Sequence, residues 1–515
     1  MAQSTAGTNL VANTQATSRT IVASVRFFWD GSTPTFETTN LKSLTITRSL
    51  SSPSAGRAAP GGNVSTDLSI TLHNPDGRYS PLNSSSPIYA DIQNNLMIGT
   101  EVHALLGYND PTNGDEILRR FTGFVTNPGL ISSLQPEVTI QATGREYNLN
   151  TNRARTGLFS EQFPHQIMET LLTDAGIDPG DQLLDTGFHR IPWVWIEGEN
   201  LMNQLQLIAE ADGGFFYVDQ SGNACFENNY HWMVDGDHTS SVITLDEGMY
   251  QRFSMAFEPQ QLYNVIRVPY KPRRPGPKTT LFQLNELWVI PPSSTRIFEV
   301  KYKAAAVAIE PLVEGDHYVA IDAAGQRRSG ALVVSVTNYG QSATVSVQNT
   351  NTVYQIELRQ FRIDGIPLAG ESTRFYEVSA ADSAIGDPTS GGLVKAFDVR
   401  ENEFLQTREQ AEGLGNMLID RMKHPRVTFM LSGCPGIPYL EIGDRITVDC
   451  TPEGVNSRAA YVTNIVERFS GGDRPVYESD LTCLDATGFF PRSPSDYFLL
   501  GTDAPHATTS KRVYY

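Results

Sequence analysis

The stretch SITLHNPDGRYSPL, residues 69–82, contains the pattern that decides the fold of this 515-residue chain. Ile70 and Leu72 alternate with polar residues, which is the period-two pattern of a half-buried β-strand. Residues 74–77 read NPDG, a combination that favours a tight turn. A strand that ends in a turn is therefore predicted here.

The same alternation recurs on both sides of this stretch. Six candidate strands result, at residues 21–29, 41–50, 65–74, 99–108, 118–127 and 137–143. The segments between them are rich in Gly, Pro, Asn and Asp, the residues that turns prefer. An antiparallel barrel or sandwich is expected over residues 20–149, after a flexible N-terminal arm at residues 1–19.

Residues 150–249 change to helical spacing and are expected to form a small α+β domain. A first helix is predicted between Ser160, as its N-cap, and a stop at Gly176, with Phe163, Ile167 and Leu171 on its apolar stripe. A second helix starts near Leu201 and ends at Gly213. The segment after it predicts a hairpin that turns at residues 219–223.

A strong strand follows at residues 262–270, LYNVIRVPY, and the segment KPRRPGPK then interrupts the pattern. Its basic residues are interpreted as a solvated linker rather than a phosphate site; they are Lys271, Arg273, Arg274 and Lys278. Short strands resume over residues 276–392, where residues 329–356 carry no charge. Their alternation predicts an inserted β-sandwich and not a membrane segment.

A third helix is predicted to start at Thr407 and Gln410, which have capping-box spacing, and to end before Pro425. Four further strands follow, at residues 426–433, 443–450, 459–469 and 477–486. Together with the strand at 262–270 they are expected to form a second barrel, divided into residues 250–275 and 393–486. Residues 487–515 predict an extended C-terminal arm.

Composition excludes several classes of protein. The formal net charge is −18, and no basic run suggests that the chain wraps nucleic acid. No run of 18 apolar residues exists, so no membrane-spanning helix and no stable membrane insertion are predicted. The four cysteines are far apart and are interpreted as buried thiols; they are Cys225, Cys434, Cys450 and Cys483.

The sequence contains no HExxH, GxGxxG, GxxxxGK[ST] or GxSxG motif, so no catalytic, cofactor-binding or metal-binding residues are predicted and no cofactor is expected. His231 and His238, with Asp235 and Asp237 between them, carry side chains that could bind a divalent ion, but a polar loop or hairpin is the preferred interpretation. The acidic loop at residues 109–116 lacks the order of a calcium loop and is interpreted as a hairpin tip.

Four segments give the chain a resemblance to a known family. They are the strand and turn at 69–82 with the F-x-G strand at 119–128, the helix, Gly-Gly and hairpin at 199–228, the strand at 261–268, and the helix, strand and Gly-Asp-Arg turn at 409–448. In this order they resemble the hub proteins of phage tail tips and baseplates and their type VI secretion relatives.

The resemblance implies a mainly β fold with two tail-tube-like β-barrels, a middle α+β domain and an inserted β-sandwich. It implies a non-enzymatic structural hub, located in the virion at the tail tip or baseplate and assembled in the host cytoplasm. Three copies would form a pseudo-sixfold ring, since each chain supplies two barrels. The implied partners are the tail tube or distal tail protein, a tip spike or fibre, the tape measure protein, and DNA that passes without specific binding.

Two other functions stay open at this point. The inserted sandwich and the 20 Tyr and 5 Trp residues allow a receptor- or carbohydrate-binding protein, because aromatic faces stack on sugars. Glu197 and Glu199, close to Trp193 and Trp195, allow a cell-envelope hydrolase with paired carboxylates. The net negative charge also suggests that acidic side chains line a channel and repel DNA.

Overall fold

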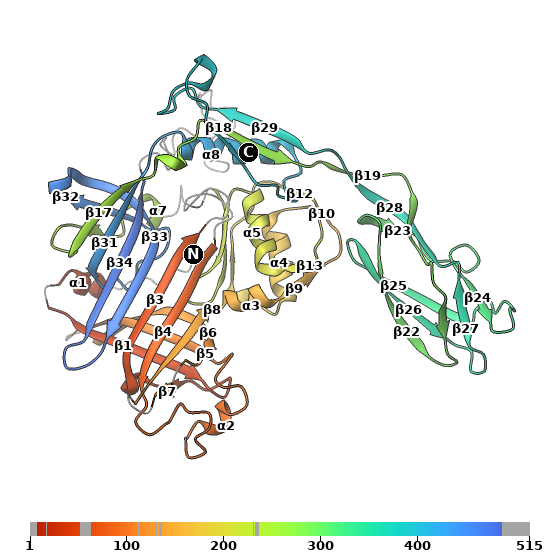
Figure 1. Cartoon of the computed structure of the whole chain (residues 1–515), viewed down its shortest axis with the longest axis horizontal. Helices are drawn as coiled ribbons and strands as arrows, with labels where there is room; N and C mark the ends of the chain where they lie inside the picture. Colours follow the sequence, from red (N-terminus) through yellow and green to blue (C-terminus); the bar gives the residue numbers. More distant parts are fainter. Residues whose placement is uncertain are drawn as a thin grey trace.

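The structure is a computed structural model, and it describes residues 8–16, 18–51, 63–110, 114–129, 131–132, 136–229, 231 and 236–486. Figure 1 shows a large β-sheet beside a group of helices, and an elongated β-rich arm that projects away from both. The mainly β fold class is thus confirmed. The described helices and 3-10 helices are α1 Thr8–Gln15, η1 Thr38–Asn40, α2 Tyr89–Ile92, α3 Glu146–Thr151, α4 Pro164–Asp174, η2 Pro179–Asp181, α5 Leu201–Ala211, α7 Gly236–Thr239, η3 Pro259–Gln261, η4 Pro388–Ser390, α8 Arg408–Met422 and η5 Thr451–Glu453.

The large sheet has 14 strands and consists of two half-sheets. The first half-sheet contains β1 Thr20–Phe28, β2 Thr35–Phe36, β3 Leu41–Ser51, β4 Asn63–His73, β5 Glu101–Asp110, β6 Gly114–Asn127, β7 Ile131–Ser132 and β8 Glu137–Gly144. The second contains β16 Thr244–Leu245, β17 Arg252–Phe257, β31 Val427–Pro435, β32 Arg445–Cys450, β33 Val455–Ser470 and β34 Val476–Asp485.

The two half-sheets are joined by antiparallel pairing of β3 with β33, from Ser43 opposite Ser470 to Ser49 opposite Asn464. The hydrogen-bonded order is β17-β31-β34-β33-β3-β4-β8-β6-β5-β1-β2, and β32, β16 and β7 pair at its sides. One hydrophobic core contains residues from both half-sheets. Two groups of strands that the sequence presents as separate units therefore form one continuous sheet.

The turn after β4 is held by buried polar contacts. Gly77 adopts a φ of 65°, which glycine tolerates without strain. Tyr79 is fully buried, and its hydroxyl donates a 2.6 Å hydrogen bond to Glu37 Oε2. The Arg78 guanidinium pairs with Glu37 Oε1 at 2.6 Å. The predicted strand and turn at residues 69–82 are confirmed, and these contacts tie the turn to the segment before β3.

The middle part contains α3, α4 and α5 together with short strands. The strands are β9 Arg153–Arg155, β10 Phe159–Gln162, β11 Gln182–Leu184, β12 Ile191–Val194, β13 Glu197–Asn200, β14 Phe215–Val218 and β15 Ala224–Glu227. The prediction of Ser160 as N-cap was wrong: Ser160 lies in β10, and Phe163 is the N-cap, because Pro164 suits the first helical position. The second helix, and the hairpin that turns at residues 219–223, are confirmed.

The strand predicted at residues 262–270 does not join the large sheet. Observed as β18 Val265–Tyr270, it pairs with β29 Arg374–Ser379 and β30 Ala396–Asp398, and α8 packs on this small sheet. It shares its hydrophobic core with the middle part. The expectation that this strand belongs to the second barrel was wrong, because its partners come more than 100 residues later. The capping box of α8 at Thr407 and Gln410 is confirmed.

The arm extends from this small sheet through paired strands and has its own hydrophobic core. Its strands are β19 Arg273–Pro275, β20 Thr279–Gln283, β21 Trp288–Ile290, β22 Thr295–Lys301, β23 Ala306–Ile309, β24 Val319–Asp322, β25 Leu332–Asn338, β26 Ser342–Asn349, β27 Ile356–Arg359 and β28 Arg362–Gly370. The charge-free stretch forms the β25–β26 hairpin. Residues 374–379, which were expected in the insertion, form β29 and return to the small sheet.

The structure bears on the predictions for the cysteines, for membrane-spanning helices and for the two ends of the chain. All four cysteines are buried free thiols, as predicted. Among the described residues, no helix combines the length and the apolar character that crossing a membrane requires. The prediction of a flexible N-terminal arm was wrong for residues 8–15, which form α1, because Leu10 is buried in the core of the large sheet. Residues 1–7 and the predicted C-terminal arm at residues 487–515 lie outside the described residues.

Candidate functional site

A buried network of charged residues lies where the two half-sheets meet. Arg48 on β3 and Arg120 on β6 come from the first half-sheet, whereas Glu467 on β33 and Glu441, between β31 and β32, come from the second. Arg120 Nε donates to both carboxylate oxygens of Glu467 at 3.1 Å, and its Nη1 lies 3.3 Å from Glu441 Oε1. Arg48 Nη1 donates to Glu441 Oε2 at 3.1 Å. We call these four residues the joint network.

The joint network is almost completely removed from water. Arg120 and Glu467 are 0% exposed, and Arg48 is 2% exposed. Two arginines against two glutamates leave no net charge, which offsets the cost of desolvation. Burial alone would lower the pKa of Arg120, but Glu467 and Glu441 outweigh it and raise that pKa above its ordinary value. Burial also raises the pKa of Glu441, although Arg48 and Arg120 act in the opposite direction. The ion pairs of Arg120 with Glu467 and Glu441 connect the two half-sheets.

The middle part also contacts the joint network. Gln220, in the turn between β14 and β15, accepts a 3.1 Å hydrogen bond from Arg48 Nη1 and donates to Glu441 Oε1. The Leu440 carbonyl accepts from Arg120 Nη2 at 2.7 Å. Three parts of the chain that are distant in sequence thus meet in one water-excluded cluster.

Sequence reasoning missed the joint network, although a signal was present. On β3, Arg48 continues the alternation of the buried residues Leu44 and Ile46, and on β33 Glu467 lies between the buried Ile465 and Phe469. A charged residue at a core position of a period-two pattern needs a buried partner of opposite charge. Only the fold shows which strands supply that partner.

The structure gives Glu197 and Glu199 a role at the base of the arm. Both lie on β13, which ends at Asn200, the N-cap of α5. Glu197 accepts hydrogen bonds from the Gln341 amide at 2.6 Å and from the Ser342 hydroxyl at 2.7 Å. Glu199 accepts from the Glu197 amide. Glu197 is therefore occupied in attaching the arm to the middle part.

Aromatic side chains at the same place are used in packing. The Arg155 guanidinium lies 4.0 Å from the centroid of the Tyr339 ring, and that of Arg273 lies 4.2 Å from the Trp195 ring. The side chain of Arg273 is only 10% exposed, so the predicted solvated linker is wrong at this residue. In the arm, Trp288 stacks on Phe298 with the ring centroids 3.6 Å apart. Trp195 and Trp288, two of the tryptophans that suggested sugar stacking, are therefore engaged in packing contacts within the chain.

The acidic loop at residues 109–116 connects β5 and β6 as an antiparallel hairpin, which agrees with the interpretation as a hairpin tip. Residues 111–113 of this loop lie outside the described residues. Asn109 and Asp115 hydrogen-bond to one another across the tip. Their side-chain atoms are thus engaged with each other.

The structure brings His231 and His238 together with Glu227, with one potential ligand atom of each within 4.8 Å of the others. Asp235 lies outside the described residues, and the same holds for the side chain of Asp237. A second group in the arm consists of Glu310, His317 and Asp364. Sequence reasoning found the two histidines of the first group but missed Glu227, although it lies four residues before His231.

The side chains of the arm group are engaged in hydrogen bonds and ion pairs. In the arm, His317 Nδ1 accepts from the Val313 amide at 3.1 Å, so Nε2 carries the proton. Lys278 pairs with Glu310 at 2.6 Å, and Arg362 pairs with Asp364 at 3.0 Å. Basic side chains already balance these carboxylates, and the arm group is an ion-pair cluster.

No protein-family model matches the chain, and no curated protein matches its sequence. The solved structures similar to it include phage tail proteins. One is the prophage MuSo2 43 kDa tail protein of Shewanella oneidensis, with 14% identity, 90% of this chain and 98% of that chain covered, and a TM-score of 0.46. Another is a tail protein of Neisseria meningitidis MC58, with 9% identity, coverage of 92% and 99%, and a TM-score of 0.48. A third is prophage tail protein gp18 of Listeria monocytogenes, with 10% identity, coverage of 91% and 94%, and a TM-score of 0.40.

Proposed function

We propose that the chain is a structural hub of a phage tail tip or baseplate and that it assembles as a homotrimeric, pseudo-sixfold ring. The observation that carries the proposal is the continuous sheet with its rigid joint. Two half-sheets fused edge to edge are two units of a ring wall in one chain, and three such chains supply six. The buried joint network supports this role because it holds the two units at a fixed angle.

The two ends of the sheet support assembly by head-to-tail contacts. Within the described residues, β17 ends one side of the sheet and β2 ends the other. Each carries an exposed aromatic residue, with Phe257 63% exposed and Phe36 59% exposed. An unpaired strand edge with an exposed apolar residue favours pairing with another chain. Contacts between two different edges close into a ring when the rotation between copies fits.

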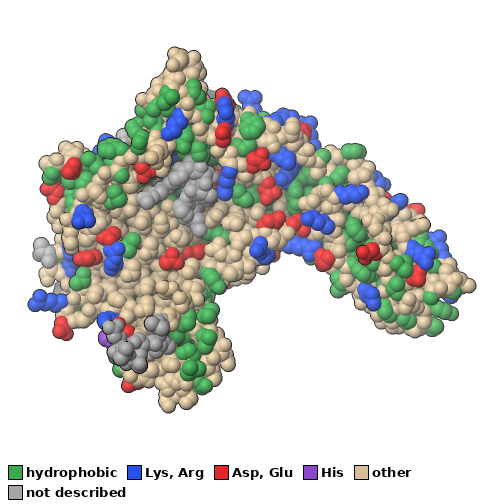
Figure 2. Space-filling view, viewed as in Figure 1, with side chains coloured by type: hydrophobic (Ala, Val, Ile, Leu, Met, Phe, Trp, Pro, Cys, Tyr) green, Lys and Arg blue, Asp and Glu red, His purple; other side chains and the backbone are tan. Residues whose placement is uncertain are grey.

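In this proposal the ring connects the tail tube or distal tail protein to a tip spike or fibre and contacts the tape measure protein. DNA passes through the lumen to the host without specific binding. The arm, residues 273–370, decorates the outside of the ring. Figure 2 shows Lys and Arg side chains among Asp and Glu side chains on one face, so the net charge of −18 is not a uniform acidic surface there. We place an acidic surface at the lumen. A DNA-binding measurement on the assembled ring tests this placement, and weak binding is the expected result.

The ring is tested by light scattering and electron microscopy of the purified full chain over a range of concentrations. The expected trimer has three times the chain mass of 56.7 kDa, about 170 kDa. Phe257→Lys places a charge on the β17 edge and should convert trimers to folded monomers. Val333→Lys is the matched control, since Val333 is 54% exposed on the arm. A chain that stays monomeric at high concentration, or trimers that survive Phe257→Lys together with Phe36→Lys, would contradict the proposal.

A further inference from the structure

The group formed by Glu227, His231 and His238 lies between the middle part and the second half-sheet. Glu227 ends β15, and His231 follows it in the next loop. His238 lies on α7, where its backbone carbonyl accepts a 3.1 Å hydrogen bond from the hydroxyl of Tyr461 on β33. The three side chains therefore belong to segments that different parts of the fold hold in place.

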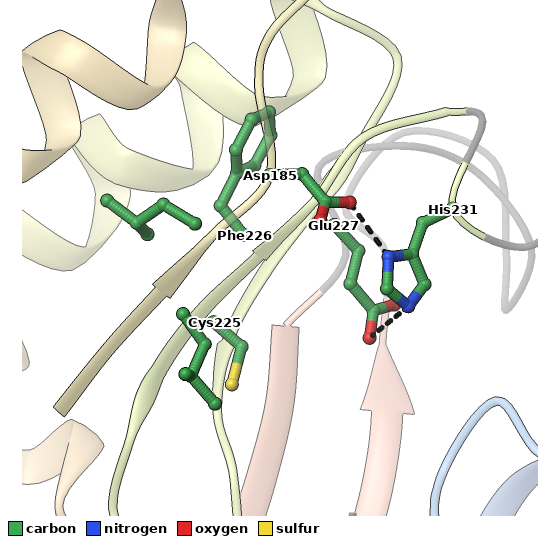
Figure 3. Close-up of a pocket in the computed structure, with 7 residues that line it drawn as sticks. Asp185, Cys225, Phe226, Glu227 and His231 are labelled. Atoms are coloured by element: carbon green, nitrogen blue, oxygen red, sulfur yellow. Dashed lines mark hydrogen bonds and ion pairs between the residues drawn. The ribbon is translucent and has the colours of Figure 1, made fainter. Parts of the chain in front are cut away.

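The hydrogen bonds of the two imidazoles indicate which ring nitrogen carries a proton. His231 Nδ1 lies 2.8 Å from Asp185 Oδ2, a carboxylate oxygen that can only accept (Figure 3). His238 Nδ1 lies 2.7 Å from the carbonyl oxygen of Gly443, which also can only accept. Both Nδ1 atoms thus carry a proton, so a metal ion would bind at Nε2 of each ring. The arm group, where Nδ1 of His317 accepts, has the opposite tautomer.

One nitrogen of each imidazole lies within 4.8 Å of a carboxylate oxygen of Glu227. Its Oε1 lies 3.9 Å from His231 Nε2, and Figure 3 shows these two groups facing each other. The rings of His231 and His238 are 5.4 Å apart between centroids, in an edge-to-face arrangement. All three residues are buried. Two imidazole nitrogens and one carboxylate oxygen form a ligand set typical of zinc.

Surrounding residues hold the three ligands in the manner of a metal site. Asp185, which orients His231, itself accepts a 3.1 Å hydrogen bond from the Asn228 amide. The hydroxyl of Tyr217 donates to Glu227 Oε1 at 2.6 Å. Carboxylate and carbonyl partners on the far nitrogen of a ligand histidine fix its tautomer and raise its basicity. A cavity of about 180 Å³, which both Glu227 and His231 line, has room for a water as fourth ligand.

We propose that Glu227, His231 and His238 bind one Zn²⁺ ion, which fastens the middle part to the second half-sheet. Tetrahedral zinc with ligand bonds of 2.0–2.1 Å requires ligand atoms roughly 3.4 Å apart. The present separations of up to 4.8 Å are closed by small side-chain rotations. The proposed ion has a structural role. The zinc site is independent of the proposed hub function, because binding of the ion requires neither a ring nor a virion.

The test uses the full chain after removal of metals with a chelator. Titration with ZnCl₂ followed by calorimetry, and metal content measured by mass spectrometry, should give one zinc per chain, whereas MgCl₂ should not bind there. His231→Gln and His238→Gln should abolish this binding. Asp185→Asn, which removes only the orienting carboxylate, should weaken it by about 10- to 100-fold. His317→Gln in the arm group is the matched control and should bind zinc as the unaltered chain does.

Three results would overturn the proposal. The first is a metal-free chain that takes up no stoichiometric zinc, which would leave the cluster as an imidazolium–carboxylate pair. The second is zinc binding that persists in both ligand variants. The third is an equal loss in the His317→Gln control. If circular dichroism shows that the ligand variants are unfolded, the proposal is tested with Asp185→Asn instead. An unchanged affinity of this variant for Zn²⁺ would overturn the proposal.

Discussion

Replacing Glu467 by glutamine tests whether the joint network holds the two half-sheets together. The substitution keeps the size of the side chain and removes one of two buried negative charges. Glu467 accepts from Arg120 Nε at 3.1 Å, lies 3.5 Å from Arg48 Nη2, and accepts from the Tyr477 hydroxyl. Two arginines would then face a single carboxylate, Glu441, in a cluster that water does not reach.

Breaking a buried ion pair by removing one partner costs about 3–5 kcal/mol. At about 1.4 kcal/mol for each factor of ten, local opening of the joint should become roughly 10²- to 10⁴-fold more frequent. Amide hydrogen exchange followed by mass spectrometry measures this opening in peptides from β3 and β33. We expect faster exchange in both strands and unchanged exchange in the arm, which has its own core.

The matched control is Glu478→Gln on the neighbouring strand β34, where the carboxylate is partly exposed and accepts a 3.3 Å hydrogen bond from Gln251. Surface changes of this kind cost about 0.5 kcal/mol or less. The double variant Arg120→Met, Glu467→Leu should be less destabilising than the sum of its single changes, because no unbalanced charge remains. Unchanged exchange in β3 and β33 of Glu467→Gln would refute the role of the joint network.

Three further predictions concern other parts of the fold. Burial raises the pKa of Glu146 to about 7, although the Thr66 amide donates to its Oε1 at 2.7 Å and acts in the opposite direction. The folded chain then keeps a proton on Glu146 that the unfolded chain loses above the ordinary pKa of 4.5. The free energy of unfolding should therefore fall by about 3 kcal/mol between pH 4.5 and 7. Denaturant titrations at several pH values should show a smaller fall in Glu146→Gln than in the unaltered chain, and an equal fall in the two proteins would contradict the prediction. A Cβ on Gly340 would lie 2.2 Å from the Cβ of Trp195, so Gly340→Ala should loosen the base of the arm and speed proteolysis there, and an unchanged cleavage rate would count against this packing. Thr407→Ala removes the N-cap of α8, whose hydroxyl accepts from the Gln410 amide at 3.2 Å, and should lower stability by about 1 kcal/mol in the same titrations; a loss below the error of measurement would show that the cap contributes nothing.

Local features of the fold followed from the sequence. The turn after β4, the hairpin at residues 219–223, and the ends of α5 and α8 depend on neighbouring residues, so short patterns predict them. The N-cap of α4 was misplaced, because Ser160 is a good capping residue and yet lies in a strand that pairs with β12. Here a tertiary contact overrode a local preference.

The candidate sites could be predicted only in part. His231 and His238 stand out because they are close in sequence, whereas Asp185 precedes His231 by 46 residues and comes from a different strand end. Arg120 and Glu467 are separated by 347 residues, and no local pattern relates them. Charge and spacing identify residues that need a partner, but they do not name that partner.

By itself, the sequence determined the β-rich character of the chain, the positions of its strands and longer helices, and the burial of its four thiols. These properties depend on side-chain periodicity and on turn chemistry within a few residues. Only the tertiary structure decided that β3 pairs with β33, that β18 leaves the large sheet for β29 and β30, and that Glu227 meets two histidines. Strand pairing uses backbone groups that every residue carries, so the choice among many apolar strands depends on how whole surfaces pack. The joint network shows the same dependence, because its charges are stable in the core only when the complete fold brings them together.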